Sequence, residues 1–139
     1  MTIETDNIAL LRRAYQDWHD SKGAGTKTLD DLFHNDVQFT SLADGAAAVE
    51  FTASRKGTDN FMSYLDGLTR DWEVIFYQVD DYIAQGERVV AIGSTSWRNK
   101  KTRKTVTTPK IDIWRIRNRQ AVEYSEYYDT AKLIAAAQP

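Results

Sequence analysis

Residues 111–129 read IDIWRIRNRQAVEYSEYYD, and this stretch decides the fold. Two runs rich in β-branched and aromatic residues flank the polar segment 117–120, which predicts two strands joined by a surface turn. Because side chains alternate across a strand, Asp112 shares one face of the first strand with Trp114 and Ile116. The expected face of the second strand carries Val122, Tyr124, Glu126 and Tyr128. Each strand thus sets an acid among apolar neighbours, where it is either hydrogen-bonded for structural reasons or kept for chemistry.

The composition fits one compact domain spanning residues 1–139. The chain has 139 residues, 42% of them hydrophobic, and a formal charge of −2. This balance gives no reason to expect nucleic acid or an anionic membrane as a partner. The absence of cysteine excludes disulfides and thiolate metal sites. Residues 1–7 lack the pattern of a signal peptide, and no apolar run is long enough for a membrane helix. We therefore expect a soluble, cytoplasmic protein.

Helical patterns occupy the first half of the chain. Spacings of three and four predict a helix ending near Ser21, capped by Thr5, Asp6 or Asn7, with this apolar stripe: Ile8, Leu11, Tyr15 and Trp18. A short second helix is expected from Thr28 or Asp30 through residue 33, and a third after residues 57–59. Residues 37–40 alternate like a strand. Residues 41–56 are expected to form a loop with a short strand at 49–52.

Strand patterns dominate the second half and predict a meander of four strands. A last short helix is expected after Asp129. Helices first and a meander afterwards are typical of an α+β domain with helices on one face of the sheet. The other face also needs a partner, because neither face of residues 89–97 is plainly polar. We therefore expect a pocket on one face and a second subunit on the other, in a homodimer. The four strands are expected at 72–84, 88–98, 106–117 and 120–128.

The expected elements occur together with six motifs: YQDW (15–18), LFHNDV (32–37), RKG (55–57), GERVV (86–90), IDIWRI (111–116) and EYSEYYD (123–129). In this order of elements and these motifs, the chain resembles the SnoaL-like branch of the nuclear transport factor 2-like superfamily. The resemblance implies an α+β conical barrel, in which a curved antiparallel sheet wraps around three N-terminal helices and a short C-terminal helix follows. It also implies a deep apolar pocket and, commonly, a homodimer. Ketosteroid isomerases, polyketide cyclases, limonene epoxide hydrolases, scytalone dehydratases and non-catalytic binding domains share this fold, so the activity must be argued from the site.

The resemblance also suggests roles for single residues. Asp112 matches the isomerase acid that stays protonated and donates a hydrogen bond to a developing oxyanion. The isomerase's proton-shuttling aspartate is replaced by Ser41, and its oxyanion-hole tyrosine falls on Ala14, while Tyr15 is expected to point elsewhere. Ketosteroid isomerisation is therefore not expected. Of the epoxide hydrolases' Asp-Arg-Asp set, only the third position keeps a carboxylate; the three positions fall on Ser94, Ser96 and Glu126.

Asp112 and Glu126 are the candidate catalytic pair, because two carboxyls in one pocket can differ in pKa and act as acid and base. The structural alternative is that a hydroxyl satisfies a buried Asp112 while Glu126 lies at a wet pocket mouth. Aromatic walls with a few polar groups suit a flat, apolar ligand, although plain core packing is the alternative. The candidate ligand-pocket residues are Trp18, Ser41, Tyr64, Ile92, Ser94, Ser96, Trp114, Tyr124 and Tyr128.

The sequence gives less support to a metal site or a nucleic-acid site. The two histidines, His19 and His34, have no partner at a metal-ligand spacing, so no metal site is expected. The basic residues within 98–104 are interpreted as a charged hairpin end rather than a nucleic-acid site. Our hypothesis is a homodimeric pocket protein, without a cofactor, that binds an apolar or aromatic metabolite. It would act as an isomerase, cyclase, dehydratase or hydrolase through acid/base chemistry. The alternative is a non-catalytic ligand-binding or dimerisation module.

Overall fold

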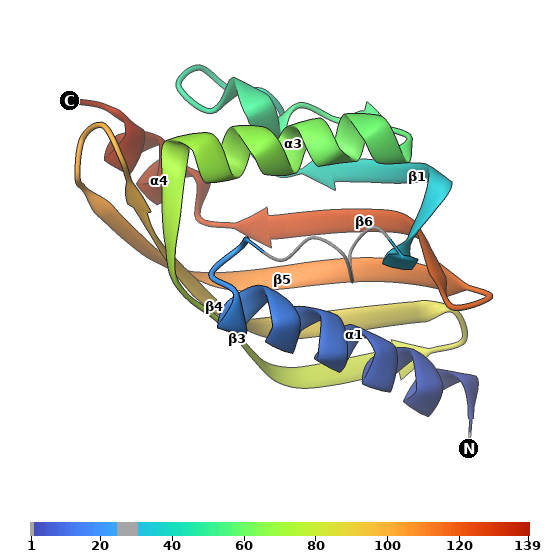
Figure 1. Cartoon of the computed structure of the whole chain (residues 1–139). Coiled ribbons are helices and arrows are strands. Elements are labelled where there is room, and N and C mark those ends of the chain that lie inside the picture. Colours follow the sequence, from blue (N-terminus) through green and yellow to red (C-terminus); the bar gives the residue numbers. More distant parts are fainter. Residues whose placement is uncertain (1, 25–30) are drawn as a thin grey trace.

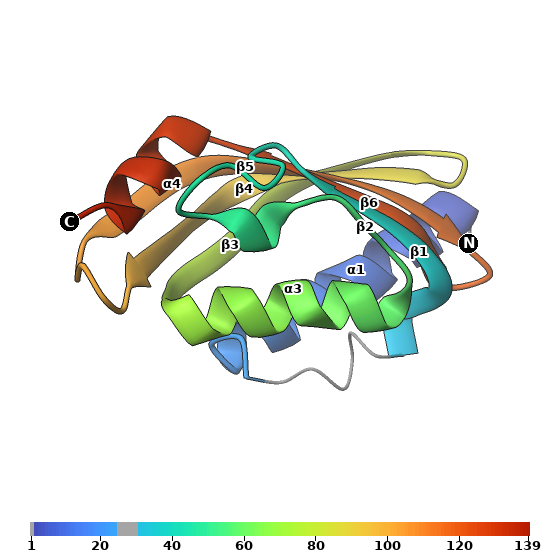
Figure 2. The same ribbon diagram turned by 90° about the horizontal axis from the view of Figure 1, so that it is seen from above.

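A curved six-stranded sheet and the helices on its concave side form the molecule. The computed structural model describes residues 2–24 and 31–139. Figures 1 and 2 show the sheet arching over α1 and α3, with α4 at one end. The fold is α+β, as expected. The elements are α1 (Ile3–Asp20), β1 (Phe33–Ser41), η1 (Glu50–Thr52), β2 (Arg55–Lys56), α3 (Thr58–Asp71), β3 (Trp72–Gln85), β4 (Arg88–Asn99), β5 (Thr105–Arg117), β6 (Gln120–Tyr128) and α4 (Thr130–Ala137).

Helix α1 presents the predicted apolar stripe to the sheet. It begins earlier than expected, because Thr2 and Thr5 form a reciprocal capping pair: the Thr2 side chain accepts from the Thr5 backbone N–H, and the Thr5 side chain accepts from Thr2. The prediction of a cap at residues 5–7 was therefore wrong. Leu11, Ala14 and Trp18 are buried in this helix. Tyr15, another residue of the predicted stripe, lies close to the strands, where its ring stacks on that of Tyr77.

The segment between α1 and α3 differs from the prediction in two places. Asp31 and Leu32 are helical, in agreement with the expected second helix, whose start at Thr28 or Asp30 lies outside the described residues; Phe33 begins β1 instead of ending that helix. The short strand expected at residues 49–52 is a 3-10 turn, η1, and the short strand is β2, which pairs with β1. Phe51 in η1 packs close to Gly67 of α3, where an added Cβ would lie 2.9 Å from the Phe51 Cβ.

The sheet order is β2-β1-β6-β5-β4-β3. Strands β3 to β6 form the predicted antiparallel meander, but β1 runs parallel to β6, so the sheet is mixed rather than wholly antiparallel. Strand β1 lies between β2, which follows it in sequence, and β6, the last strand of the meander; it is antiparallel to β2 and parallel to β6. This pairing sets Ser41 opposite Glu126.

Irregular pairing between β3 and β4 accompanies the curvature of the sheet. The register shifts between Val74 and Phe76 and again between Val79 and Asp81. Gly93 lies opposite the second shift, and a Cβ there would be 1.9 Å from the backbone oxygen of Gln78. Only glycine fits this close approach of two strands.

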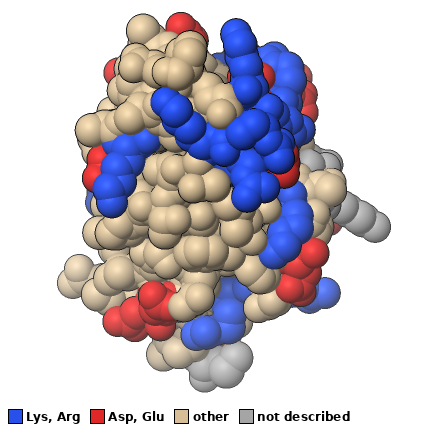
Figure 3. All heavy atoms as spheres, turned by 90° about the vertical axis from the view of Figure 1, so that its left-hand side faces the viewer, with Lys and Arg blue, Asp and Glu red and all other residues tan. Residues whose placement is uncertain are grey.

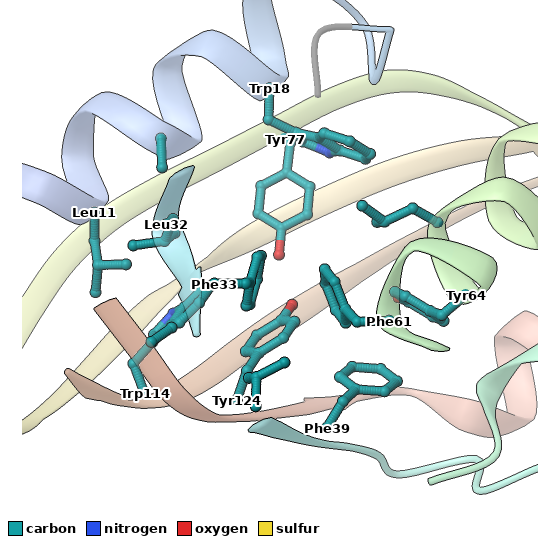
Figure 4. Packing of buried hydrophobic residues seen from close by; sticks show 14 of the residues in the cluster. Leu11, Trp18, Leu32, Phe33, Phe39, Phe61, Tyr64, Tyr77, Trp114 and Tyr124 are labelled. Atoms are coloured by element: carbon teal, nitrogen blue, oxygen red, sulfur yellow. The ribbon is translucent and has the colours of Figure 1, made fainter. Parts of the chain in front are cut away.

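The core lies between the concave face and helices α1 and α3. Figure 4 shows rings from helices and strands converging there, with the hydroxyl groups of Tyr77 and Tyr124 directed toward one another. The Trp114 and Tyr124 rings are stacked at 4.2 Å between centroids. Helix α4 begins after Asp129, whose side chain accepts from the Lys132 backbone N–H, as predicted. In the described part of the chain, no helix is long and apolar enough to cross a membrane.

Candidate active site

Strands β5 and β6 bring a lysine and two acids to the concave face. Lys110, Asp112 and Trp114 alternate inward on β5, and Asp112 pairs directly with Glu126 on β6. A register shift after Arg115 turns Ala121 inward beside Ile116. The prediction that Val122 shares the inner face was therefore wrong, because a bulge breaks the alternation of β6 at that point.

Asp112 accepts hydrogen bonds from three donors. The Lys110 ammonium donates to Oδ1 at 2.6 Å, while the Tyr77 hydroxyl, at 2.7 Å, and the Tyr15 hydroxyl both donate to Oδ2. The Trp114 indole N–H in turn donates to the Tyr15 oxygen at 2.8 Å. The prediction that Tyr15 points elsewhere was wrong, since the helix turn carries its ring over the sheet. A carboxyl group surrounded only by donors is suited to the ionised form.

Glu126 is held by a second set of donors. Its Oε1 accepts from Ser41 at 2.7 Å and from Tyr64 at 2.9 Å. Its Oε2 lies 3.1 Å from the Lys110 ammonium and accepts from Tyr124 at 3.3 Å. Because the Ser41 proton goes to Glu126, the Tyr128 hydroxyl, 2.5 Å away, donates to the Ser41 oxygen.

Lys110 links the two carboxylates. Its side chain is 8% exposed, against 2% for Asp112 and 4% for Glu126. It also donates to the Tyr77 oxygen at 2.5 Å and to the Tyr124 oxygen at 3.2 Å. Four acceptors thus share three ammonium hydrogens. We call these three charged residues and the hydroxyl groups bonded to them the buried charge cluster; its members are Tyr15, Ser41, Tyr64, Tyr77, Lys110, Asp112, Tyr124, Glu126 and Tyr128.

The electrostatics of the cluster keep the lysine charged and the phenols neutral. Burial by itself lowers the pKa of Lys110, but the Asp112 and Glu126 charges outweigh it and raise that pKa above its ordinary value. Desolvation, reinforced by the carboxylate charges, raises the pKa of Tyr15, Tyr64, Tyr77 and Tyr124 well above the usual value. Burial and the Glu126 charge raise the pKa of Tyr128 to about 12. With both acids ionised, the cluster carries one net negative charge.

A cavity of about 100 Å³ adjoins the cluster. Its wall is mostly aromatic and aliphatic, with rings from α1, α3 and the strands, and Lys110, Glu126 and the cluster tyrosines form its polar part. Asp112 is not part of this wall; it lies behind Lys110 and Tyr77. Glu126 and Lys110, but not Asp112, are therefore placed to touch a bound molecule.

The structure brings many of the predicted site residues together. The cavity wall includes Trp18, Tyr64, Trp114, Tyr124, Glu126 and Tyr128. Ser41 bonds to two of them but is not part of the wall. Among the described residues, no group of three His, Cys, Asp or Glu side chains is arranged to hold a metal ion.

Three predicted pocket residues lie on the outer face of the sheet. Ser94, Ser96 and Ile92 pair with Pro109, Thr107 and Ile111 of β5, which point away from the cavity. Thr95 and Trp97 of the same strand face the cavity instead. The assignment of Ile92, Ser94 and Ser96 to the pocket is thus corrected, because directly paired residues share a face and the inner face of β5 is that of Lys110 and Asp112.

Sequence reasoning missed Lys110 and Tyr77. Lys110 lies two residues before Asp112 on the same strand, so alternation places both side chains on one face. This spacing was the signal that could have identified Lys110. Tyr77 comes from β3, on the far side of β4, and nothing in the sequence pattern connects it to Asp112.

The basic residues near the β4–β5 turn are tied to neighbouring segments. The Lys100 ammonium donates to the Thr69 carbonyl and the Lys104 ammonium to the Gln138 carbonyl, both at 2.8 Å, and Arg103 pairs with Glu73 at 3.0 Å. Figure 3 shows Lys and Arg side chains gathered on this end of the molecule. These contacts fasten the turn to α3, β3 and the C-terminal segment.

Solved structures similar to this chain share its fold at low sequence identity. An NTF2-like protein of unknown function from Burkholderia pseudomallei K96243 has 20% identity, a TM-score of 0.82 and full coverage of both chains. TerC, co-crystallised with polyporic acid, has 18% identity and a TM-score of 0.79 over 96% of this chain and 98% of TerC. A protein with a ketosteroid isomerase-like fold from Catenulispora acidiphila DSM 44928, in complex with trimethylamine, has 16% identity and a TM-score of 0.71. That match covers 86% of this chain and 88% of the other.

Sequence comparison gives the family directly. Among curated proteins, none matches this chain significantly. The SnoaL-like domain matches residues 11–124, which include the second half of α1, strands β1 to β5, the start of β6 and most of the buried charge cluster. This chain therefore belongs to the SnoaL-like domain family of the NTF2-like superfamily, which includes polyketide cyclases and isomerases.

Proposed function

We propose that this protein binds a small apolar or aromatic molecule in the cavity beside the buried charge cluster. The observation that carries the proposal is the cavity itself, about 100 Å³ in volume and walled by aromatic rings around a few polar groups. This volume is somewhat below the roughly 150 Å³ of a protein cavity that holds benzene. The best-fitting ligand is therefore about the size of one aromatic ring.

A thermal-shift screen with single-ring aromatic compounds tests this proposal. A ligand that binds only the folded state, present at about 100 times its Kd, stabilises the protein by about 2.7 kcal/mol. Ala14 lines the cavity and is not a member of the cluster, so the extra side-chain volume of Ala14→Leu should abolish the shift. Ser94→Ala, on the outer face, is the matched control and should leave it unchanged. If no small aromatic compound stabilises the wild type, the binding proposal is wrong.

Acid/base catalysis is the second candidate function, and the position of Glu126 favours it. Glu126 lies in the cavity wall next to the Lys110 ammonium. A bound ketone could lose a proton from its α-carbon to Glu126, and the electron pair of the broken C–H bond would move onto the carbonyl oxygen beside Lys110. Reversal of the step returns a proton to carbon. Asp112, which does not line the cavity, would serve as a positioning residue for Lys110.

Hydrogen exchange into an enolisable ketone tests the catalytic candidate. Acetophenone in D₂O should exchange its methyl hydrogens faster with the protein than with buffer, as followed by NMR. Glu126→Gln should remove the excess rate, and Ser94→Ala should keep it. Exchange at the buffer rate, together with measurable binding, would favour the non-catalytic binding module.

We also propose that the outer face of the sheet contacts a second copy of the chain. Ile83, Ile111 and Tyr127 are large apolar residues on strands of this sheet, with 56%, 40% and 38% of their surface exposed. Ile111 pairs with Ile92 on one side and with Tyr127 on the other, so their side chains share the outer face. An apolar sheet face of this kind is typical of an interaction surface.

A further inference from the structure

We infer that the ligand of this cavity presents a hydrogen-bond donor, in the preferred case an ammonium group, to the buried charge cluster. The inference rests on the proposed binding function and names the class of ligand. It comes from two observations: where each hydrogen of the cluster goes, and the net charge of the cluster.

The hydrogens of the cluster are already directed at acceptors within it. The hydroxyl groups of Tyr64, Tyr77 and Tyr124 donate to carboxylate oxygens, and the Lys110 ammonium has more acceptors than hydrogens. Tyr128 donates to Ser41, which donates to Glu126. A ligand oxygen that only accepts would have to break one of these bonds.

Acceptor capacity remains on the cavity side of the same groups. A phenol oxygen accepts as well as donates. The Tyr64 hydroxyl donates to Glu126, and within the described part of the chain no donor is directed to its oxygen. Tyr64 lines the cavity. A ligand N–H or O–H can therefore bond to the cluster without displacing any of its present partners.

The net charge points in the same direction. Asp112 and Glu126 outnumber Lys110 by one charge, and Glu126 is the acid that lines the cavity. Aromatic faces also attract cations, and the Lys110 nitrogen already lies 4.9 Å from the centre of the Tyr77 ring and 5.7 Å from that of the Tyr124 ring. An anion would instead be placed beside a carboxylate in a poorly solvated space, which is unfavourable. Four indoles in the wall, those of Trp18, Trp72, Trp97 and Trp114, add further aromatic faces.

A matched set of one-ring compounds tests the inference by calorimetric titration at neutral pH. Benzylamine is a cationic donor, benzyl alcohol a neutral donor, anisole its isomer that only accepts, and benzoate an anion. We expect benzylamine to bind about tenfold or more tighter than anisole, with benzyl alcohol between them and benzoate weakest. Glu126→Gln should bring the benzylamine and anisole affinities within about twofold of each other, while Ser94→Ala should preserve the wild-type ratio.

The outcomes separate this inference from the binding proposal. Equal affinities for benzylamine and anisole, or tighter binding of anisole or benzoate, would overturn the preference for donors and leave the cavity a binding site. Tighter binding of an acceptor would also favour the catalytic candidate, because Lys110 would then be open to a ligand oxygen. Binding of none of the four compounds would contradict both proposals. The wild-type series needs no variant, so the result does not depend on how Glu126→Gln folds.

Discussion

Replacing Lys110 by methionine should strongly destabilise the protein. Methionine keeps most of the length of the side chain but removes the charge that lies 2.6 Å from Asp112 and 3.1 Å from Glu126. All three side chains are at most 8% exposed, so solvent cannot replace the ammonium. Removing one partner of a buried ion pair typically costs about 3–5 kcal/mol, and here two carboxylates lose their partner. This is a large part of the roughly 5–15 kcal/mol that stabilises an ordinary domain.

Urea unfolding at pH 7, followed by circular dichroism, measures this loss. For a chain of this size, about 3–5 kcal/mol corresponds to a fall in Tm of roughly 10–20 °C. Adding Asp112→Asn and Glu126→Gln to the variant should recover part of the stability, because the unpaired charges are then absent. A loss below about 1 kcal/mol for Lys110→Met would refute the reasoning that the lysine is the buried counter-charge of both acids.

Three further predictions follow from other features of the structure. Burial raises the pKa of the cluster tyrosines in the folded state, and that of Tyr128 to about 12, so the unfolded chain should lose these protons first as the pH rises above about 10. Stability should then fall by up to about 1.4 kcal/mol per pH unit for each such tyrosine, and their absorbance change near 295 nm should coincide with unfolding. Gly93→Ala should destabilise the protein by about 1–3 kcal/mol or more, because its Cβ would meet the Gln78 oxygen at 1.9 Å; an unchanged urea midpoint would contradict this. Ile111→Glu should shift the protein from dimer to monomer in light scattering with little change in Tm, whereas a monomeric wild type would contradict the dimer proposal.

Much of the fold followed from local pattern. The helical stripe of α1, the third helix and the four long strands all match periodicity and turn chemistry that can be read directly from the chain. The predicted strand 120–128 coincides with β6, and Asp129 caps α4. The alternation within residues 111–116 also placed Asp112 inward correctly. These features depend on neighbours a few residues apart, so sequence order suffices for them.

The site depended on contacts between distant strands. Alternation divides β4 into two faces but does not say which one meets the helices, and Ile92, Ser94 and Ser96 were therefore assigned to the wrong face. The pairing of β4 with β5 decides which face of β4 meets the helices. The parallel pairing of β1 with β6 likewise brings Ser41 to Glu126 across 85 positions, and no local pattern encodes it.

Residues 111–129 show which features follow from the sequence alone and which depend on the tertiary structure. Their sequence alone determined a hairpin with an acid on each strand facing inward, because side-chain direction in a strand follows from parity. The tertiary structure decided which groups surround those acids. Lys110, just before this stretch, lies between them, and hydroxyl groups from α1, α3 and β3 complete the shell around them. A lysine in isolation is expected in solvent, and only the convergence of two carboxylates outweighs the cost of burying its charge.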